Sequence, residues 1–372
     1  MTLEEARPVR QEDSFDVART DAWLKQQTDL SGDPDVRQFP GGASNLTYLL
    51  RYPGRDLILR RPPRGVKAKS AHDMRREHLI QSRLRSAYGY VPRMVALCTD
   101  DSVIGSDFYV MEALDGVILR RDLPAGVTLA PSQARSLCHH VVDRLVELHR
   151  VDPVAAGLEE IGRGRGYVGR QVAGWTERYR RARTPNVPSW RKVTAWLADH
   201  RPDDVDVCVI HNDYRFDNVV LDPTQLGAAP AAAAPSRDST APSGDGADVV
   251  VGILDWEMAT LGDPLMDLGG ALAYWTQADD SHLARFLRRQ PTHLPGMLTR
   301  REVVDYYCAQ TGRSPGNWAF YEVFGLFRLA AIAQQIYYRY YRKETRNPAF
   351  RHIWVGVRQL HRRARRLIRA SR

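Results

Sequence analysis

A polar octet between two apolar runs constrains this chain more than any other feature. Residues 207–210 are apolar, residues 211–218 read His-Asn-Asp-Tyr-Arg-Phe-Asp-Asn, and the chain turns apolar again at 219–221. Further on, the apolar run 249–254 ends on Asp255. Short apolar runs between polar segments are typical of buried strands. The pattern predicts strands that end in carboxylate-bearing loops, an arrangement that favours a divalent metal beside a reacting hydroxyl group.

The spacing His-x-Asp-x-x-x-x-Asn assigns a different task to each polar residue. Asp213 can accept a hydrogen bond from an incoming hydroxyl and take its proton late in transfer, while Asn218 and Asp255 offer the oxygen ligands that suit Mg²⁺. Protein kinases carry the same order of groups. His211 is assigned a structural role, as support for the loop backbone. In the alternative interpretation, Asp213 and Asp217 only form turns and Asn218 caps one.

A glycine-containing segment near the N-terminus is a candidate phosphate-binding loop. Gly42, Ser44 and Asn45 precede a strand predicted at 46–52. Backbone N–H groups freed by glycine, together with the Ser44 hydroxyl, can approach phosphate oxygens. The alternative is an ordinary turn between two strands.

A basic residue and an acidic residue follow this loop in the order that a nucleotide site requires. A Pro-Gly turn joins 46–52 to a second strand at 57–61, and a helix predicted at about 71–87 carries Glu77. Strand alternation favours Arg60 over Arg61 as the residue that faces the α- and β-phosphates, without excluding Arg61. Glu77 would hold this arginine. The alternative is a surface ion pair worth about 0–1 kcal/mol.

The next strands complete a β-rich first part of the chain. They are predicted at 94–98 and 108–112. The backbone at Met111 and Glu112 is a candidate for hydrogen bonds with an adenine edge, and a plain edge strand is the alternative.

The remainder is predicted to be helical, with helices at 131–149, 167–183, 189–200 and 351–369 and an apolar, aromatic helical segment at 323–341. Residues 223–247 are rich in Ala, Pro, Ser, Gly and Asp and are predicted to form a disordered insertion. Asp263 follows a Gly-containing turn and is expected to cap the next helix. Asp267 is expected to brace the catalytic loop.

Composition excludes several classes of protein. The chain has 372 residues, 43% of them hydrophobic, and no apolar run long enough for a transmembrane helix. Its N-terminus lacks the apolar core of a secretory signal. Four scattered cysteines favour reduced thiols and a cytoplasmic location over a zinc or disulfide framework. The net charge of +9 is compatible with nucleic acid, a nucleotide or another anionic ligand.

The sequence resembles the aminoglycoside phosphotransferase family in three main segments: 211–218, Ile-Leu-Asp-Trp-Glu at 253–257 and Leu-Gly-Asp-Pro at 261–264. The resemblance extends over about residues 20–345 and is strongest to the kinase-like domain at the N-terminus of some acyl-CoA dehydrogenases. Two departures stand out: Asn212 replaces the usual glycine after the loop histidine, and the 223–247 insertion is long.

The resemblance implies an α+β, bilobal, protein-kinase-like fold. Residues 1–112 would form a β-rich nucleotide-binding N-lobe, and residues 113–372 a helical C-lobe with the acceptor site. It also implies ATP and Mg²⁺ as cofactors and transfer of phosphate to a small-molecule hydroxyl. Asp213 would be the catalytic base, Asn218 and Asp255 the metal ligands, and Arg60 would stand where kinases usually carry lysine.

Charge and aromatic content bear on the acceptor. From residue 270 onward, arginines and lysines are about three times as frequent as carboxylates, which disfavours a polycationic aminoglycoside. We expect an anionic or apolar acceptor such as a hydroxyacyl-CoA, with an antibiotic as the alternative. Two further alternatives are a nucleotide-binding pseudokinase and a nucleic-acid binder that uses the arginine-rich tail at 358–372. Because the tail has an apolar stripe, we expect a packed helix and no nucleic-acid or membrane partner.

Overall fold

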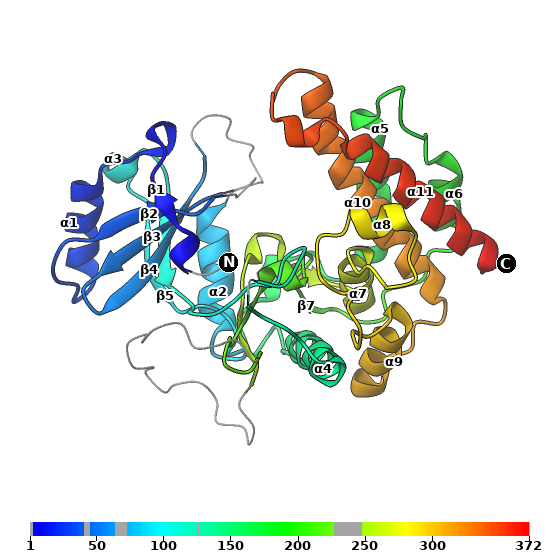
Figure 1. Cartoon of the computed structure of the whole chain (residues 1–372), viewed down its shortest axis with the longest axis horizontal. Coiled ribbons are helices and arrows are strands. Elements are labelled where there is room, and N and C mark those ends of the chain that lie inside the picture. The colour runs from blue at the N-terminus through cyan, green and yellow to red at the C-terminus, as the bar shows by residue number, and fades with distance from the viewer. Residues whose placement is uncertain (1–2, 41–44, 64–72, 125, 227–247, 372) are drawn as a thin grey trace. The chain divides into compact units, whose positions relative to one another are not determined.

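The computed structural model describes residues 3–40, 45–63, 73–124, 126–226 and 248–371 (Figure 1). Gly42 and Ser44 of the candidate phosphate-binding loop lie outside the described residues, as do residues 227–247 of the predicted insertion.

The chain forms two compact units, each assembled from segments far apart in the sequence. Unit 1 comprises Met1–Leu129, Val154–Ile161 and Phe216–Met258. Unit 2 comprises Ala130–Pro153, Gly162–Arg215 and Ala259–Arg372. The segments of the two units interleave along the chain. The division into an N-lobe at 1–112 and a C-lobe at 113–372 stays a prediction.

Unit 1 is built on a six-stranded sheet in the order β1-β2-β3-β4-β6-β5, with every neighbouring pair antiparallel. Its strands are β1 (Arg7–Pro8), β2 (Asp35–Gln38), β3 (Leu46–Tyr52), β4 (Arg55–Arg61), β5 (Met94–Cys98) and β6 (Phe108–Glu112). The β3–β4 hairpin turns at Gly54, whose φ of 78° suits glycine. The structure therefore contains all four strands expected between residues 46 and 112, and adds β1 and β2.

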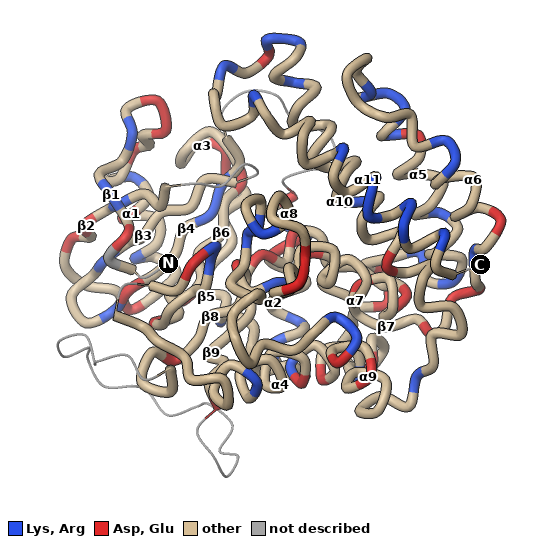
Figure 2. Tube along the Cα trace, turned by 45° about the vertical axis from the view of Figure 1, so that its right-hand side comes forward, with Lys and Arg blue, Asp and Glu red and all other residues tan. Residues whose placement is uncertain are grey.

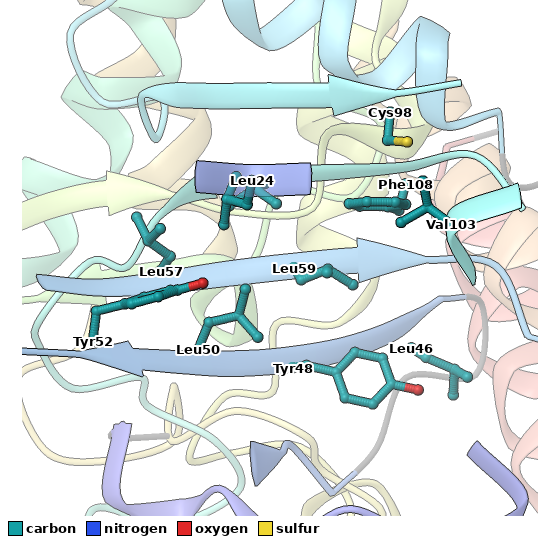
Figure 3. Packing of buried hydrophobic residues seen from close by; sticks show 11 residues of the cluster. Leu24, Leu46, Tyr48, Leu50, Tyr52, Leu57, Leu59, Cys98, Val103 and Phe108 are labelled. Carbon is teal, nitrogen blue, oxygen red and sulfur yellow. The ribbon is translucent and has the colours of Figure 1, made fainter. Parts of the chain in front are cut away.

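Helices cover both faces of this sheet (Figure 1). On one face, Leu24 of α1 (Val17–Gln27) packs with alternate residues of β3 and β4, among them Tyr48, Leu50 and Leu57 (Figure 3). On the other face, Met74 of α2 (Met74–Leu84) packs with residues of the opposite parity. The short helix α3 (Asp101–Ile104) precedes β6. Because both faces are buried, the middles of β3 and β4 are apolar, at residues 48–50 and 57–59, and a charged residue buried in one of these strands needs a partner.

A second, smaller sheet in unit 1 consists of β8 (Val219–Leu221) and β9 (Val250–Ile253), paired antiparallel with Val219 opposite Ile253. The 3₁₀ turns η4 (Phe216–Asn218) and η5 (Trp256–Met258) flank the same end of this pair. The strand pair predicted around the insertion is therefore present.

Unit 2 is mainly helical. Its helices are α4 (Pro131–Leu148), α5 (Tyr167–Ala182), α6 (Arg191–Asp199), α7 (Pro264–Ala273), α8 (His282–Phe286), α9 (Arg300–Thr311), α10 (Trp318–Tyr341) and α11 (Ile353–Ala370). Two short strands, β7 (Cys208–Ile210) and β10 (Thr260–Gly262), pair antiparallel beside them. The predicted tail helix α11 packs against α10 with Val357, Ala364 and Ile368 buried, as its apolar stripe indicates.

The α7–α10 contact depends on two glycines. A Cβ atom on Gly325 of α10 would lie 2.1 Å from the Gly269 carbonyl oxygen, and one on Gly269 would lie 2.6 Å from the Tyr321 carbonyl oxygen. The helices therefore approach through bare backbone, which brings the first turns of α10 close to the second turn of α7.

No helix in the described part of the chain combines the length and the apolar character needed to cross a lipid bilayer.

Candidate active site

Alternation along β4 separates its two arginines. Arg61 points to the α1 face, where its guanidinium lies 5.5 Å from the Tyr48 ring centroid and donates to the Tyr48 hydroxyl. Arg60 points to the opposite face, since it pairs in register with Tyr109 of β6 and forms an ion pair with Glu77 of α2. The sheet therefore places Arg60, and not Arg61, on the face where Glu77 lies, as strand alternation indicated.

The Arg60–Glu77 pair is buried and charge-assisted. Arg60 Nη1 lies 2.7 Å from Glu77 Oε1, and the two side chains are 11% and 2% exposed. Tyr109 donates its hydroxyl to the same carboxylate oxygen at 2.7 Å. Burial raises the pKa of Glu77 above its ordinary value, although the charge of Arg60 and the Tyr109 hydrogen bond oppose that rise. The surface-pair alternative is excluded by this burial.

Arg60 also reaches the end of the small sheet. Its Nη2 atom lies 3.2 Å from Asp255 Oδ1, so one guanidinium bridges two carboxylates from segments far apart in the sequence. Asp255 has a φ of 69°, in the left-handed region that a non-glycine residue adopts at some cost. This turn directs the carboxylate just after β9 toward the Arg60 face.

Asn218 lies next to Asp255 because of the β8–β9 register. Its carbonyl oxygen accepts a hydrogen bond of 2.8 Å from the Leu254 N–H, one step beyond the Val219–Ile253 pair. Asn218 is 7% exposed, whereas the Asp255 side chain is 32% exposed. The backbone pairing thus brings Asn218 and Asp255, from two adjacent strand ends, close together within unit 1.

These two residues fit Mg²⁺ better than a metal with an all-protein cage. Mg²⁺ is commonly held by one or two protein carboxylates or amides with the remaining positions filled by water and phosphate. Among the described residues, no group of three or more His, Cys, Asp or Glu side chains is arranged to hold a metal ion. One amide and one carboxylate, the donors of Asn218 and Asp255, suit a metal whose other ligands are water and phosphate oxygens.

Asn45, expected next to phosphate, is 2% exposed, and its Nδ2 donates to Glu257 Oε2 at 3.1 Å. This contact ties the start of β3 to the turn that follows Asp255. It joins the described end of the glycine-containing segment to Glu257, two residues after the candidate metal ligand Asp255, within unit 1.

The alternative of a plain edge strand for β6 is wrong, because β6 lies between β4 and β5. The Glu112 N–H donates to the Arg93 carbonyl at 2.9 Å, and the Ala113 N–H donates to the Asp56 carbonyl at 3.2 Å. Glu112 also binds Arg93 and Arg55 through its side chain. An adenine contact at Met111 or Glu112 therefore stays a prediction that must use groups other than these two N–H donors.

In unit 2, the start of the candidate catalytic loop is held by the first turn of α7. Asp267 accepts from the backbone N–H of His211 at 2.7 Å and of Asn212 at 2.8 Å. Asp263 caps the same helix, accepting from the N–H groups of Leu265 and Met266. The two expectations for Asp263 and Asp267, a helix cap and a brace for the loop, are both met by these contacts.

His211 is fully buried and accepts a hydrogen bond from the Asp213 N–H through Nδ1 at 3.2 Å. This contact fits the structural role expected for His211. Asp213 itself is half-buried, and the Nε atom of Arg215 lies 3.3 Å from its Oδ2. The Arg215 guanidinium stacks on Tyr274, 4.9 Å from the ring centroid. A fixed cation thus lies beside the carboxylate expected to act as base.

A chain of buried hydrogen bonds through His149 supports Asp267. His149 Nε2 lies 3.2 Å from Asp267 Oδ2, and His149 Nδ1 lies 2.7 Å from the Tyr307 hydroxyl. Burial alone would raise the pKa of Asp267, but His149 and the loop N–H donors hold that pKa below its ordinary value. Asp267 is therefore an anion whose hydrogen bonds fix the loop backbone.

Tyr109 and His149 are positioning residues that the sequence analysis did not name. For Tyr109 a signal existed, because alternation in 108–112 places it on the Met111 face of the strand. For His149 the family resemblance marked its segment, 148–153, but no local pattern indicated its role, since its partners Asp267 and Tyr307 lie 118 and 158 residues away in the sequence.

Comparison with known proteins decides the family. The sequence profile described as "Phosphotransferase enzyme family" matches residues 35–228 and 244–303, a span that includes every candidate site residue from Gly42 to Asp255. The chain belongs to this phosphotransferase family. Its resemblance to aminoglycoside phosphotransferases and to domains of acyl-CoA dehydrogenases is thereby confirmed.

The curated relatives of this phosphotransferase are larger proteins. It is 34% identical over 337 residues to acyl-CoA dehydrogenase family member 10 of Mus musculus, with 90% of this chain and 29% of the relative covered. It is 31% identical over 341 residues to family member 11 of Rattus norvegicus, with 88% of this chain and 40% of the relative covered. The chain thus spans less than half the length of these relatives.

A solved structure shows the fold over the whole phosphotransferase. A crystal structure titled "putative aminoglycoside phosphotransferase", from Ralstonia eutropha, is 27% identical and superposes with a TM-score of 0.74, covering 95% of this chain and 99% of the other. The predicted α+β, protein-kinase-like fold class is confirmed.

Proposed function

We propose that this phosphotransferase transfers the γ-phosphate of ATP to a hydroxyl group of a small molecule in the presence of Mg²⁺. The observation that carries the proposal is the buried arginine that bridges Glu77 and Asp255. A cation fixed between a helix carboxylate and the carboxylate of an Ile-Leu-Asp segment has the charge and the support needed to hold phosphate oxygens.

In this proposal the nucleotide binds along unit 1. Arg60 binds the α- and β-phosphates, and Glu77 keeps the guanidinium in place. Gly42, Ser44 and Asn45 approach the phosphates from the glycine-containing loop, and the backbone near Met111 and Glu112 contacts the adenine. Arginine replaces the more usual lysine, and its planar fork allows two parallel hydrogen bonds to oxygens.

Asn218 and Asp255 would hold Mg²⁺, which when bound neutralises charge on the phosphates. Asp213 accepts the hydrogen bond of the acceptor hydroxyl and takes its proton as the oxygen–phosphorus bond forms and ADP leaves. Asn218 follows Asp213 by five residues, so one short segment links the proposed base to the proposed metal ligand. Asp267 and His211 keep that segment in shape.

The acceptor is proposed to be anionic or apolar, a hydroxyacyl-CoA being the first candidate. Arg215 lies 3.3 Å from Asp213, and arginines follow one another along α11 (Figure 2). Positive charge next to the proposed base attracts an anionic acceptor and repels a polycation. The names of the curated relatives, acyl-CoA dehydrogenase family members, support acyl-CoA chemistry as the place to search. An aminoglycoside or other antibiotic is the alternative, supported by the name of the R. eutropha structure.

A substrate screen tests this proposal. The protein is incubated with ATP and Mg²⁺ and with hydroxyacyl-CoAs, aminoglycosides and macrolides in separate reactions, and each product is examined by mass spectrometry for one added phosphate. We expect phosphorylation of hydroxyacyl-CoAs. Phosphorylation of kanamycin-type compounds alone would exclude the proposed acceptor while keeping the proposed reaction.

A nucleotide-binding pseudokinase is the competing class, and Asp213→Ala separates it from an enzyme. We expect this variant to lose at least about 10³-fold in kcat, with the ATP dissociation constant unchanged, because the base acts only on the acceptor. Equal and non-zero rates of phosphate transfer for wild type and variant would refute the role of Asp213. ATP binding without transfer to any compound of the screen would favour the pseudokinase.

A further inference from the structure

Asn212, directly before the proposed base, occupies a backbone conformation that few residues adopt. Its φ is 66°, in the left-handed region where glycine carries no penalty and asparagine a smaller one than most residues. A non-glycine residue stays there only when its surroundings hold it. The contacts of Asn212 show what supplies this restraint.

Three helices of unit 2 bind Asn212 at three different atoms. The Tyr167 hydroxyl of α5 donates to Asn212 Oδ1 at 2.9 Å, and Arg328 Nη2 of α10 donates to the Asn212 carbonyl at 2.6 Å. The third contact is the Asn212 N–H to Asp267 of α7. Side chain, carbonyl and amide of this one residue are thereby fixed from separate directions.

The two donor side chains are themselves buried and packed. Tyr167 and Arg328 are 5% and 6% exposed, and the Arg328 guanidinium stacks on Trp175 at 5.5 Å. Two glycines leave the space that these side chains need. A Cβ atom on Gly262 would lie 2.9 Å from the Tyr167 ring, and one on Gly270 would lie 3.3 Å from Arg328 Nη1.

We propose that Tyr167 and Arg328 are positioning residues that hold Asn212 in its left-handed turn and thereby aim Asp213 at the acceptor hydroxyl. This inference rests on the proposed function, because it assigns Asp213 the role of base. Both residues act through Asn212 and need not touch either substrate. Their loss is therefore expected to reduce kcat and to leave nucleotide binding in unit 1 unchanged.

The test removes one oxygen atom. Tyr167→Phe keeps the ring and deletes the hydrogen bond to Asn212, and we expect kcat to fall about fivefold to tenfold, the size of one buried hydrogen bond, with KM for ATP unchanged. Tyr179→Phe is the matched control on the same helix, because the Tyr179 hydroxyl donates to the Pro188 carbonyl at 2.7 Å, away from the loop. This control should lower thermal stability without lowering kcat.

A double-mutant cycle identifies Asn212 as the link. Glycine at position 212 adopts the turn without help, so Tyr167→Phe in an Asn212→Gly background should lower kcat by less than about twofold. The same fivefold loss in both backgrounds, or an unchanged kcat for Tyr167→Phe, would overturn the inference.

Hydrogen exchange provides a readout that does not depend on transfer. The amides of residues 211–213 should exchange faster in Tyr167→Phe than in wild type and in Tyr179→Phe. Absence of transfer by the wild type to any acceptor would refute the proposed function alone. Unchanged exchange at these amides would refute the positioning role alone.

Discussion

Replacement of Glu77 by glutamine tests the reasoning about the buried arginine most directly. Glutamine has nearly the same shape and can still accept hydrogen bonds from Tyr109 and Arg60, but it removes the negative charge. At a separation of about 4 Å and an effective dielectric constant of about 20, the lost attraction is about 4 kcal/mol. Two features of the structure make the expected loss in the free energy of unfolding smaller than this.

The first is desolvation, since burial already disfavours the ionised form of Glu77 and raises its pKa. The second is Asp255, which stays 3.2 Å from Arg60 and keeps the cation partnered. Complete loss of the partner of a buried charge costs about 3–5 kcal/mol, so with Asp255 in place we expect a loss of about 1–2 kcal/mol in the free energy of unfolding. Arg60 should then attract the Asp255 carboxylate more strongly, so that Asp255 is a weaker ligand for Mg²⁺. We therefore expect Mg²⁺ and ATP to bind about tenfold more weakly.

Urea unfolding and calorimetric titration with Mg²⁺ and ATP measure these two effects. Asp107→Asn is the matched control. Asp107 Oδ2 lies 2.6 Å from Nε of Arg75, which is on α2 like Glu77, but the Arg75 side chain is 60% exposed. The control should change neither the free energy of unfolding nor the affinity for Mg²⁺ and ATP measurably. If Glu77→Gln binds Mg²⁺ and ATP as tightly as wild type and unfolds at the same urea concentration, the Arg60–Glu77 pair does not organise the nucleotide site.

Two further predictions concern unit 2. Burial lowers the pKa of His149 below 6.5, partly offset by Asp267, so the neutral ring stabilises the fold above pH 6.5 and this contribution is lost as the pH falls from there toward the folded-state pKa. His149→Gln should therefore flatten the pH dependence of the unfolding free energy below pH 6.5, and an unchanged slope would contradict the assignment. Gly325→Ala places a Cβ atom 2.1 Å from the Gly269 carbonyl oxygen and should cost about 1–3 kcal/mol or more. The control is Gly356→Ala on α11, where the nearest atom to an added Cβ is 3.9 Å away, and this change should raise the free energy of unfolding by up to about 1 kcal/mol. Equal changes in the unfolding free energy for the two alanine variants would refute the close α7–α10 contact.

Local pattern was sufficient to predict most elements of the fold. Strands 46–52 and 108–112 were predicted with the bounds that the structure has, because their apolar runs end at turn residues or charged residues. Strand β2, at 35–38, was missed because its residues Asp-Val-Arg-Gln are mostly polar and resemble a loop. The position of β6 inside the sheet also required the structure, because strand order depends on partners that no single segment encodes.

The chemistry was readable because it depends on residue types at short spacing. The octet at 211–218 and the apolar run that ends on Asp255 are the basis for the proposed roles of Asp213, Asn218 and Asp255, and strand alternation is the basis for the choice of Arg60. Periodicity can indicate which face a side chain occupies, but it cannot indicate what lies opposite that face.

Tertiary structure alone decided the supporting contacts. The bridge from Arg60 to Asp255 spans 195 residues of sequence, and the hydrogen bond from Arg328 to Asn212 spans 116. Asn212 is the clearest case. The sequence showed that a glycine was replaced there, but only the structure showed a left-handed turn held by hydrogen-bond partners from three helices: the donors Tyr167 and Arg328 and the acceptor Asp267. Such contacts depend on the packing of distant elements, and that packing is set by the whole core at once.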